Sequence, residues 1–214
     1  MLMNLISRRG VLCCGVASLL GVSTIPNHEQ LLANRSCGIS TLQGGPEEIP
    51  VEPNKWGKTH LKYNIGSRDL RDMSVYTWDS EFHNAFKSWS DVSVLTFEKV
   101  KREEDADILI NIGRRKKEHF GEKGGVLAWA YLPSSPNFDG VLSSKFDIAE
   151  DWVLPSLHDK GIVLRAVAAH EIGHLLGLRH SENFMSLMFP YYSEYITSPH
   201  EEDIERIKSL YEKK

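Results

Sequence analysis

Residues 170–180 read HEIGHLLGLRH, and this run constrains the fold more than any other part of the chain. His170 and His174 are four residues apart, so on a helix their rings lie one turn apart on the same face and can reach one metal ion. If the helix continued, His180 would lie about 120° around the axis from His174 and about 9 Å along it. Gly177 can adopt the left-handed conformation that ends helices and reverses the chain. We therefore expect the helix to end near Gly177 and His180 to return to the same ion.

Three imidazoles with one open position are typical of a catalytic zinc, because structural zinc sites have four protein ligands. Zinc lowers the pKa of its bound water to about 7 and polarises a carbonyl group. Glu171 is placed to accept the proton of that water and to pass it to a leaving amine. The alternative is that these are ordinary helical histidines, but the complete HExxHxxGxxH spacing argues against it.

This spacing is the metzincin signature, which predicts a tight turn that places a methionine beneath the metal. The segment SLMFPYY, residues 186–192, supplies Met188 for that turn. Met185 is the competing methionine, and the proline that follows soon after Met188 favours Met188.

The first 27 residues contain Arg8 and Arg9, followed by about a dozen apolar or small residues. They are typical of a signal peptide, and the apolar run is too short to span a membrane comfortably. An uncleaved anchor is the alternative, and SRRGVL also resembles a bacterial twin-arginine signal, so the export route stays open. We expect a secreted, extracellular protein without stable membrane insertion.

The remaining composition predicts one domain with appendages. The chain has 214 residues, 41% hydrophobic side chains and a formal net charge of -4, which is ordinary for a globular domain. A mildly acidic protein with one short basic run, RRKK at 114–117, lacks the charge that nucleic-acid binding requires. Residues 28–53 hold Cys37 and a stretch rich in Gly, Pro and Glu, which is typical of an exposed linker. We assign 1–27 to the signal peptide, 28–53 to a short propeptide and linker, and 54–214 to a catalytic domain.

Hydrophobic periodicity predicts the elements of that domain. Alternating or β-branched segments predict strands at 59–65, 94–100, 106–112 and 124–131. Helices are expected at 73–90, 160–176 and 199–214, the first with an aromatic face formed by Val75, Trp78, Phe82, Ala85, Phe86 and Trp89. Strands before and after a helix, followed by helices alone, predict an α/β (α+β) domain with one mixed sheet.

Six segments resemble the catalytic domain of the matrixins (matrix metalloproteinases), a family of metzincin zinc endopeptidases. In chain order they are KWGKTHLKYNI, ADILI, GGVLAWAYLP, KFDIAEDW, VAAHEIGHLLGLRHS and LMFPYY. Ser181 after the third histidine is similar to matrixins, since astacins and adamalysins carry an acid there. The resemblance implies a twisted mixed five-stranded sheet, three helices and a zinc cleft below an edge strand. We expect a minimal form without a hemopexin-like domain.

RSCGIS, residues 35–40, is similar to the end of matrixin propeptides, PRCGxPD, where a cysteine thiolate fills the fourth zinc position and keeps the enzyme latent. Arg35, Cys37 and Gly38 match that pattern, whereas its prolines and its aspartate are missing. The resemblance implies that Cys37 binds zinc in a latent form. The alternative is a stray exposed thiol.

The resemblance also bears on further metals. Matrixins generally hold a second, structural zinc through three histidines and an aspartate, but Trp129 and Lys145 stand where two of those histidines would be, and His119 is the one nearby candidate left. We therefore expect one catalytic zinc and no structural second zinc. Asp107, Asp147 and Glu150 match calcium-binding positions of the family, while Ser143 replaces the usual acid of the loop at 138–144. Two interpretations of these three acids therefore stay open: they bind calcium, or they are plain surface carboxylates.

For substrates, the resemblance implies an extended peptide that adds a strand along residues 126–131. Leu127 and Ala128 would supply main-chain contacts, and Pro190 and Tyr192 the wall of the pocket for the side chain after the scissile bond. The small Ala166, four residues before His170, implies a deep apolar pocket for Leu-like side chains. Glu202 and Asp203 match a paired-acid position of the last helix, where Asp203 would support the methionine turn by hydrogen bonding.

We therefore predict a secreted zinc-dependent endopeptidase that cleaves extracellular proteins by Glu-assisted attack of zinc-bound water and is made as a cysteine-switched zymogen. We expect a monomer whose partners are protein substrates and protein protease inhibitors. One alternative is a catalytically impaired matrixin-like binding protein. Another is a metal-sequestering protein, which would need all four ligand positions filled after the linker is cut.

Overall fold

The structure is a computed structural model that describes residues 36–39, 54–66, 74–113, 120–134, 137–155 and 161–212. For residues 36–39 the description covers the backbone alone. The predicted signal peptide, most of the predicted propeptide and linker, the basic run at 114–117 and His119 lie outside the described residues.

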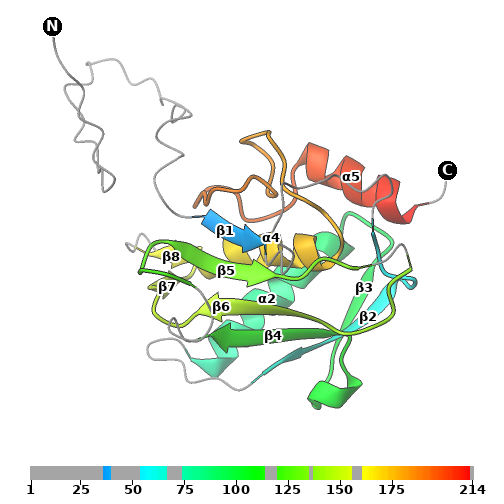
Figure 1. The fold of residues 1–214 in the computed structure, drawn as a ribbon, viewed down its shortest axis with the longest axis horizontal. Coiled ribbons are helices and arrows are strands. Elements are labelled where there is room, and N and C mark those ends of the chain that lie inside the picture. Colours follow the sequence, from blue (N-terminus) through cyan, green and yellow to red (C-terminus); the bar gives the residue numbers. More distant parts are fainter. Residues whose placement is uncertain are drawn as a thin grey trace, which may run out of the picture.

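One mixed sheet forms the framework of the domain (Figure 1). Its strand order is β1-β5-β6-β4-β2-β3, in which β5 runs antiparallel to β6 and the other neighbours are parallel. Five strands come from the predicted catalytic domain, as expected, and β1 adds a sixth from the RSCGIS segment. The strands are β1 (Ser36–Ile39), β2 (His60–Ile65), β3 (Thr96–Lys99), β4 (Ile108–Gly113), β5 (Val126–Ala130) and β6 (Leu142–Asp147).

Three α-helices are described, as expected, and the starts of two of them have identifiable causes. They are α2 (Val75–Ser90), α4 (Leu164–Leu175) and α5 (Glu201–Tyr211), with a short 3-10 helix, η1, at Glu103–Asp105. Helix α2 begins where the Ser74 hydroxyl accepts the backbone N–H of Thr77 at 3.1 Å, a typical N-cap. Helix α4 begins later than predicted because residues 162–163 form β8 (Ile162–Val163), which pairs in parallel with β7 (Trp152–Val153) in a small second sheet.

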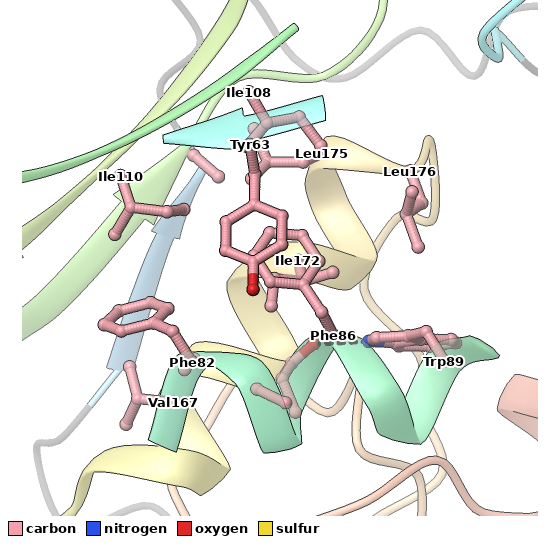
Figure 2. Close-up of a cluster of buried hydrophobic side chains, with 14 of the residues drawn as sticks. Tyr63, Phe82, Phe86, Trp89, Ile108, Ile110, Val167, Ile172, Leu175 and Leu176 are labelled. Atoms are coloured by element: carbon pink, nitrogen blue, oxygen red, sulfur yellow. Dashed lines mark hydrogen bonds between the residues drawn. The ribbon is translucent and has the colours of Figure 1, made fainter. Parts of the chain in front are cut away.

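The core lies between the large sheet and helices α2 and α4, which cover the same face of it (Figures 1 and 2). Tyr63 of β2 stacks on Phe86 of α2 with ring centroids 4.1 Å apart. Phe82 meets Phe146 of β6 edge to face at 5.0 Å. The aromatic face predicted for α2 is buried, except that Val75 is 49% exposed because it is the first residue of the helix.

Two polar contacts fix α2 against α4. The indole Nε1 of Trp89 donates to the carbonyl of Ala169 at 2.8 Å, the dashed line in Figure 2. The guanidinium of Arg165 donates twice to the buried carboxylate of Glu81, at 2.8 and 3.0 Å. Because these contacts lie one and five residues before His170 on the same helix, the packing of α2 against α4 sets the position of the metal-binding residues. None of the helices in the described part of the chain combines the length and the apolar character needed to cross a membrane.

Trp89→Phe should lower the free energy of unfolding by about 2–3 kcal/mol, since it removes buried ring volume and leaves the Ala169 carbonyl without its donor. Urea denaturation measures the change. The matched control is Tyr76→Phe on the same helix, whose side chain is 84% exposed, and it should change stability by less than about 0.5 kcal/mol. Equal stability of the two variants would contradict this account of the core.

Candidate metal centre

The chain reverses at Gly177, directly after α4. Gly177 has φ +101°, a left-handed conformation that side chains rarely adopt. Its N–H donates to the His174 carbonyl at 2.8 Å, and the N–H of Leu178 donates to the Gly173 carbonyl at 2.9 Å, so the last helical carbonyls are satisfied. A Cβ at Gly177 would overlap the carbonyl oxygen of Asn54. Both the conformation and the packing therefore require glycine here.

The reversal brings three imidazole rings together. The Nε2 atom of His174 lies 3.0 Å from Nε2 of His170 and 3.2 Å from Nε2 of His180. Nitrogens bound tetrahedrally to one zinc at about 2.0–2.1 Å lie about 3.4 Å apart, so the spacing and the donor set fit zinc. Within the described residues, these histidines are the one group of three or more His, Cys, Asp or Glu placed to hold a metal ion.

Backbone carbonyls fix the orientation of two of the rings. The Nδ1 of His170 lies 2.6 Å from the carbonyl of Leu187, and the Nδ1 of His174 lies 2.7 Å from that of Leu178. Since a carbonyl only accepts, each Nδ1 carries the proton and each Nε2 presents a lone pair. Burial lowers the pKa of His170 to about 3 and holds the pKa of His174 well below its usual value. Both rings are therefore neutral near pH 7, the form that binds metal.

Glu171 lies on α4 between the first two histidines and is fully buried. Burial raises the pKa of its carboxyl well above the ordinary range, because a carboxylate is poorly solvated there. A carboxylate of raised basicity beside the metal ligands is suited to accept a proton from a bound water.

Met188 packs against the metal-binding helix α4 at Gly173. It is fully buried, and a Cβ added to Gly173 would overlap its sulfur. The rival Met185 is 43% exposed. The turn that carries Met188 is held by Asp203 of α5, whose carboxylate accepts the backbone N–H groups of Leu187 at 2.7 Å and Met188 at 3.3 Å. Sequence reasoning proposed this supporting role for Asp203, and the structure shows it.

A pocket with an empty volume of about 420 Å³, part of it open to solvent, lies beside the histidines. Four of the residues predicted for substrate binding line it: Leu127, Ala166, Pro190 and Tyr192. The fifth, Ala128, has its side chain buried opposite Phe146 of β6; it was predicted to contact substrate through its main chain, which stays a prediction. Sequence reasoning missed Phe184, Phe189 and Ile196; they lie in an irregular loop, where periodicity gives no signal.

The matrixin family model matches residues 55–212 of the chain. The chain belongs to the matrixin family. It is 39% identical over 193 residues to stromelysin-2 of Rattus norvegicus, which covers 86% of this chain and 38% of that protein. It is 37% identical over 190 residues to matrix metalloproteinase-26 of Homo sapiens, covering 86% and 69%, and 36% identical over 201 residues to macrophage metalloelastase of Rattus norvegicus, covering 92% and 40%. The chain thus spans about two fifths of the length of the stromelysins it matches.

In this matrixin, backbone from the RSCGIS segment lies along the outer edge of β5. Strand β1 pairs with β5 in parallel, with Ser36 opposite Val126 and Ile39 opposite Ala130. This is the edge at which the resemblance places an extended substrate. Arg35 and the Cys37 side chain lie outside the described part of the structure.

Two positions predicted to have lost structural-zinc ligands form a cross-strand pair. Trp129 of β5 lies opposite Lys145 of β6, and the Lys145 ammonium is 5.4 Å from the centre of the Trp129 ring. This is cation–π geometry, typically worth about 0.5–1 kcal/mol at an exposed site. Neither an indole nor an ammonium group can bind zinc, so these two positions do not fit a second zinc.

The acids at the predicted calcium positions lie at opposite ends of the sheet. Asp107 precedes β4, where its Oδ1 accepts from Lys58 Nζ at 2.7 Å. Asp147 ends the parallel strand β6, and beyond it Glu150 accepts the N–H of Gly124 at 2.7 Å. The structure therefore places Asp147 near Glu150 and far from Asp107. Calcium takes six to eight oxygens, which carboxylates supply together with backbone carbonyls and waters, so calcium binding at these acids stays a prediction.

Gly173→Ala should destabilise the protein by about 1–3 kcal/mol, although alanine is the better helix former. The new Cβ would overlap the Met188 sulfur and lie 2.9 Å from Cζ2 of Trp89. Thermal denaturation of the metal-free protein measures the loss, and zinc titration should show weaker binding. As a control, Ser209→Ala on the exposed side of α5 should be neutral or slightly stabilising. If Gly173→Ala were equally stable, the packing under the metal-binding helix would be wrong.

Proposed function

We propose that this chain is a secreted zinc-dependent endopeptidase that hydrolyses peptide bonds of extracellular proteins. The observation that supports it most is the convergence of three histidine Nε2 atoms, with Glu171 buried on the helix that carries two of those histidines. The matrixin family assignment supports the same reaction. We expect one zinc per chain, held by His170, His174 and His180.

The chain's own groups account for the proton transfers. When bound, zinc would supply a Lewis acid that polarises the scissile carbonyl and acidifies a water. Glu171 accepts a proton from the attacking water and returns it to the leaving amine, so the carboxylate is regenerated in each cycle. The Leu187 and Leu178 carbonyls hold two of the ligand rings in the required tautomer throughout.

Substrate binding relies on the main-chain N–H and carbonyl groups along the outer edge of β5, and on the pocket. Once β1 leaves, an extended peptide can pair with the main chain of β5. The side chain after the scissile bond then enters the pocket between Leu127, Ala166 and Tyr192. The phenolic oxygen of Tyr192 accepts the backbone N–H of Val163 at 2.8 Å, which fixes that wall. The mainly apolar lining of the pocket favours a leucine-like side chain.

We further propose that the chain is a zymogen. The pairing of β1 with β5 puts the RSCGIS backbone where a substrate would bind, and the Cys37 thiolate would take the fourth zinc position. Cleavage within 40–53 would release both. The predicted signal peptide at 1–27 would direct secretion; we expect the protein to act as a monomer that protein protease inhibitors can block. Asp107, Asp147 and Glu150 remain the positions proposed for calcium, with Asp107 at the other end of the sheet from the other two.

In chains activated by cleavage within 40–53, Glu171→Ala should lower kcat/KM for a quenched peptide by at least about 10²–10⁴ because the proton acceptor is lost. Zinc content, measured by mass spectrometry of the metal, should stay at one per chain. The control is Glu182→Ala, an exposed carboxylate near the same loop, which should keep wild-type turnover. Equal turnover by Glu171→Ala and wild type would instead favour the catalytically impaired binding protein.

Cys37→Ser should make the unprocessed chain active, since a serine hydroxyl is a much poorer zinc ligand than a thiolate. Peptidase activity of the intact chain, with its mass checked before and after the assay, tests this. Ser36→Ala is the control and should stay as latent as wild type. Latency that persists in Cys37→Ser would mean that β1 pairing alone blocks the cleft.

Ala166→Arg should reduce cleavage before leucine by more than tenfold while cleavage before alanine persists, because a long side chain would fill the pocket. A peptide library varied at the residue after the scissile bond measures the preference. Circular dichroism confirms that the variant is folded. An unchanged preference for leucine would show that Ala166 does not set the depth of the pocket.

A further inference from the structure

The third histidine lies outside regular secondary structure. His170 and His174 share helix α4, whereas His180 lies in the loop that follows Gly177. A helix holds its own side chains through backbone hydrogen bonds, but a loop residue depends on contacts to its neighbours. The contacts that hold residues 179 and 181 therefore contribute to the position of His180.

Helix α5 holds both neighbours of His180. The guanidinium of Arg206 donates to the Arg179 carbonyl at 2.7 Å. The Ser181 hydroxyl donates to the Glu202 carboxylate at 2.6 Å. Glu202 and Arg206 are one helical turn apart, and their own ion pair is long, at 3.9 Å. Each side chain therefore binds the loop more closely than it binds the other.

Helix α5 is itself fixed to the domain by other contacts. Asp203 binds the turn that carries Met188, and Ile207 and Leu210 are buried in the core. The Tyr211 hydroxyl donates to the Leu176 carbonyl at 2.9 Å, at the C-terminal end of α4. Figure 1 shows α5 beside the long loop that follows α4. One helix is thus anchored at both ends of the segment that carries His180.

We propose that Glu202 and Arg206 are positioning residues that hold the His180 ring where it can bind the same zinc ion as His170 and His174. This inference rests on the zinc centre proposed above, and it goes beyond it by assigning the C-terminal helix a role in metal retention. Outer contacts of this kind typically change metal affinity by about 10–100-fold. Because α5 does not line the pocket, KM should change less than kcat.

The test measures zinc release from the full chain in a Cys37→Ser background, where the thiol cannot contribute. Zinc transfer to the coloured chelator 4-(2-pyridylazo)resorcinol gives the rate. Glu202→Ala and Arg206→Ala should each release zinc at least tenfold faster than the parent. Glu205→Ala and Lys208→Ala, exposed on the same helix, should stay within twofold.

Two further measurements separate positioning from general destabilisation. The melting temperature of the metal-free Glu202→Ala and Arg206→Ala chains should lie within a few degrees of the controls. The double variant Ser181→Ala/Glu202→Ala should release zinc no faster than Glu202→Ala alone, because the two substitutions remove the same hydrogen bond. If an alanine variant fails to fold, Glu202→Gln and Arg206→Lys replace it and should give release rates between those of the parent and the tenfold change.

The inference is overturned if release from both Glu202 and Arg206 variants stays within twofold of the parent, if the controls accelerate equally, or if the Ser181 and Glu202 effects simply multiply. A parent chain that binds zinc but cleaves no peptide even after cleavage within 40–53 has released β1 would refute the proposed peptidase and leave the positioning role intact. A parent chain that binds no zinc would refute both.

Discussion

The reversal of the chain at Gly177 is the constraint on which the metal centre depends. Two imidazoles on one helix cannot form a three-nitrogen site alone, and a straight helix would carry His180 away from them. The positive φ of Gly177 returns the chain, and the Asn54 carbonyl occupies the space where a side chain would begin. The first described residues of the domain thus pack against the reversal. Correct placement of His180 therefore requires the amino-terminal end of the domain to be folded.

The rest of the fold holds this reversal in place through buried polar groups that form hydrogen bonds. The Asp203 carboxylate gathers backbone donors from the methionine turn and from the start of α5. The N–H of Ser181 donates to the Met188 carbonyl at 2.9 Å, so the histidine loop and the methionine turn also bind each other. Such a network is sensitive to loss of one member, because the remaining groups would be buried without partners. We infer that the site is rigid before any metal arrives.

The sequence predicts those parts of the structure that obey a simple period or a complete motif. Helical spacing and one glycine were enough to place three histidines, and the aromatic period gave the buried face of α2. The start of α4 was predicted too early because residues 162–163 pair with β7, a tertiary contact that a local pattern does not report. Phe184 and Ile196 reach the pocket from irregular loops, and Val75 lost its predicted burial at a helix end. The features that were missed depend on tertiary pairing, on irregular loops or on the end of an element, and none of these follows from a period.

In the zymogen proposed above, the pairing of β1 with β5 would link latency to the chemistry of a sheet edge. An uncovered edge strand presents unpaired N–H and carbonyl groups, which any extended chain can bind. An enzyme that binds its substrate by strand addition needs such an edge, but the same edge favours aggregation before the substrate arrives. In this chain the RSCGIS backbone covers the edge, so one short segment can satisfy those groups and exclude substrate together. The parallel pairing involves only a short segment, since Ser36, Gly38 and Ile39 lie opposite residues of β5 where the substrate would bind. A propeptide as short as residues 28–53 is therefore compatible with a covered cleft.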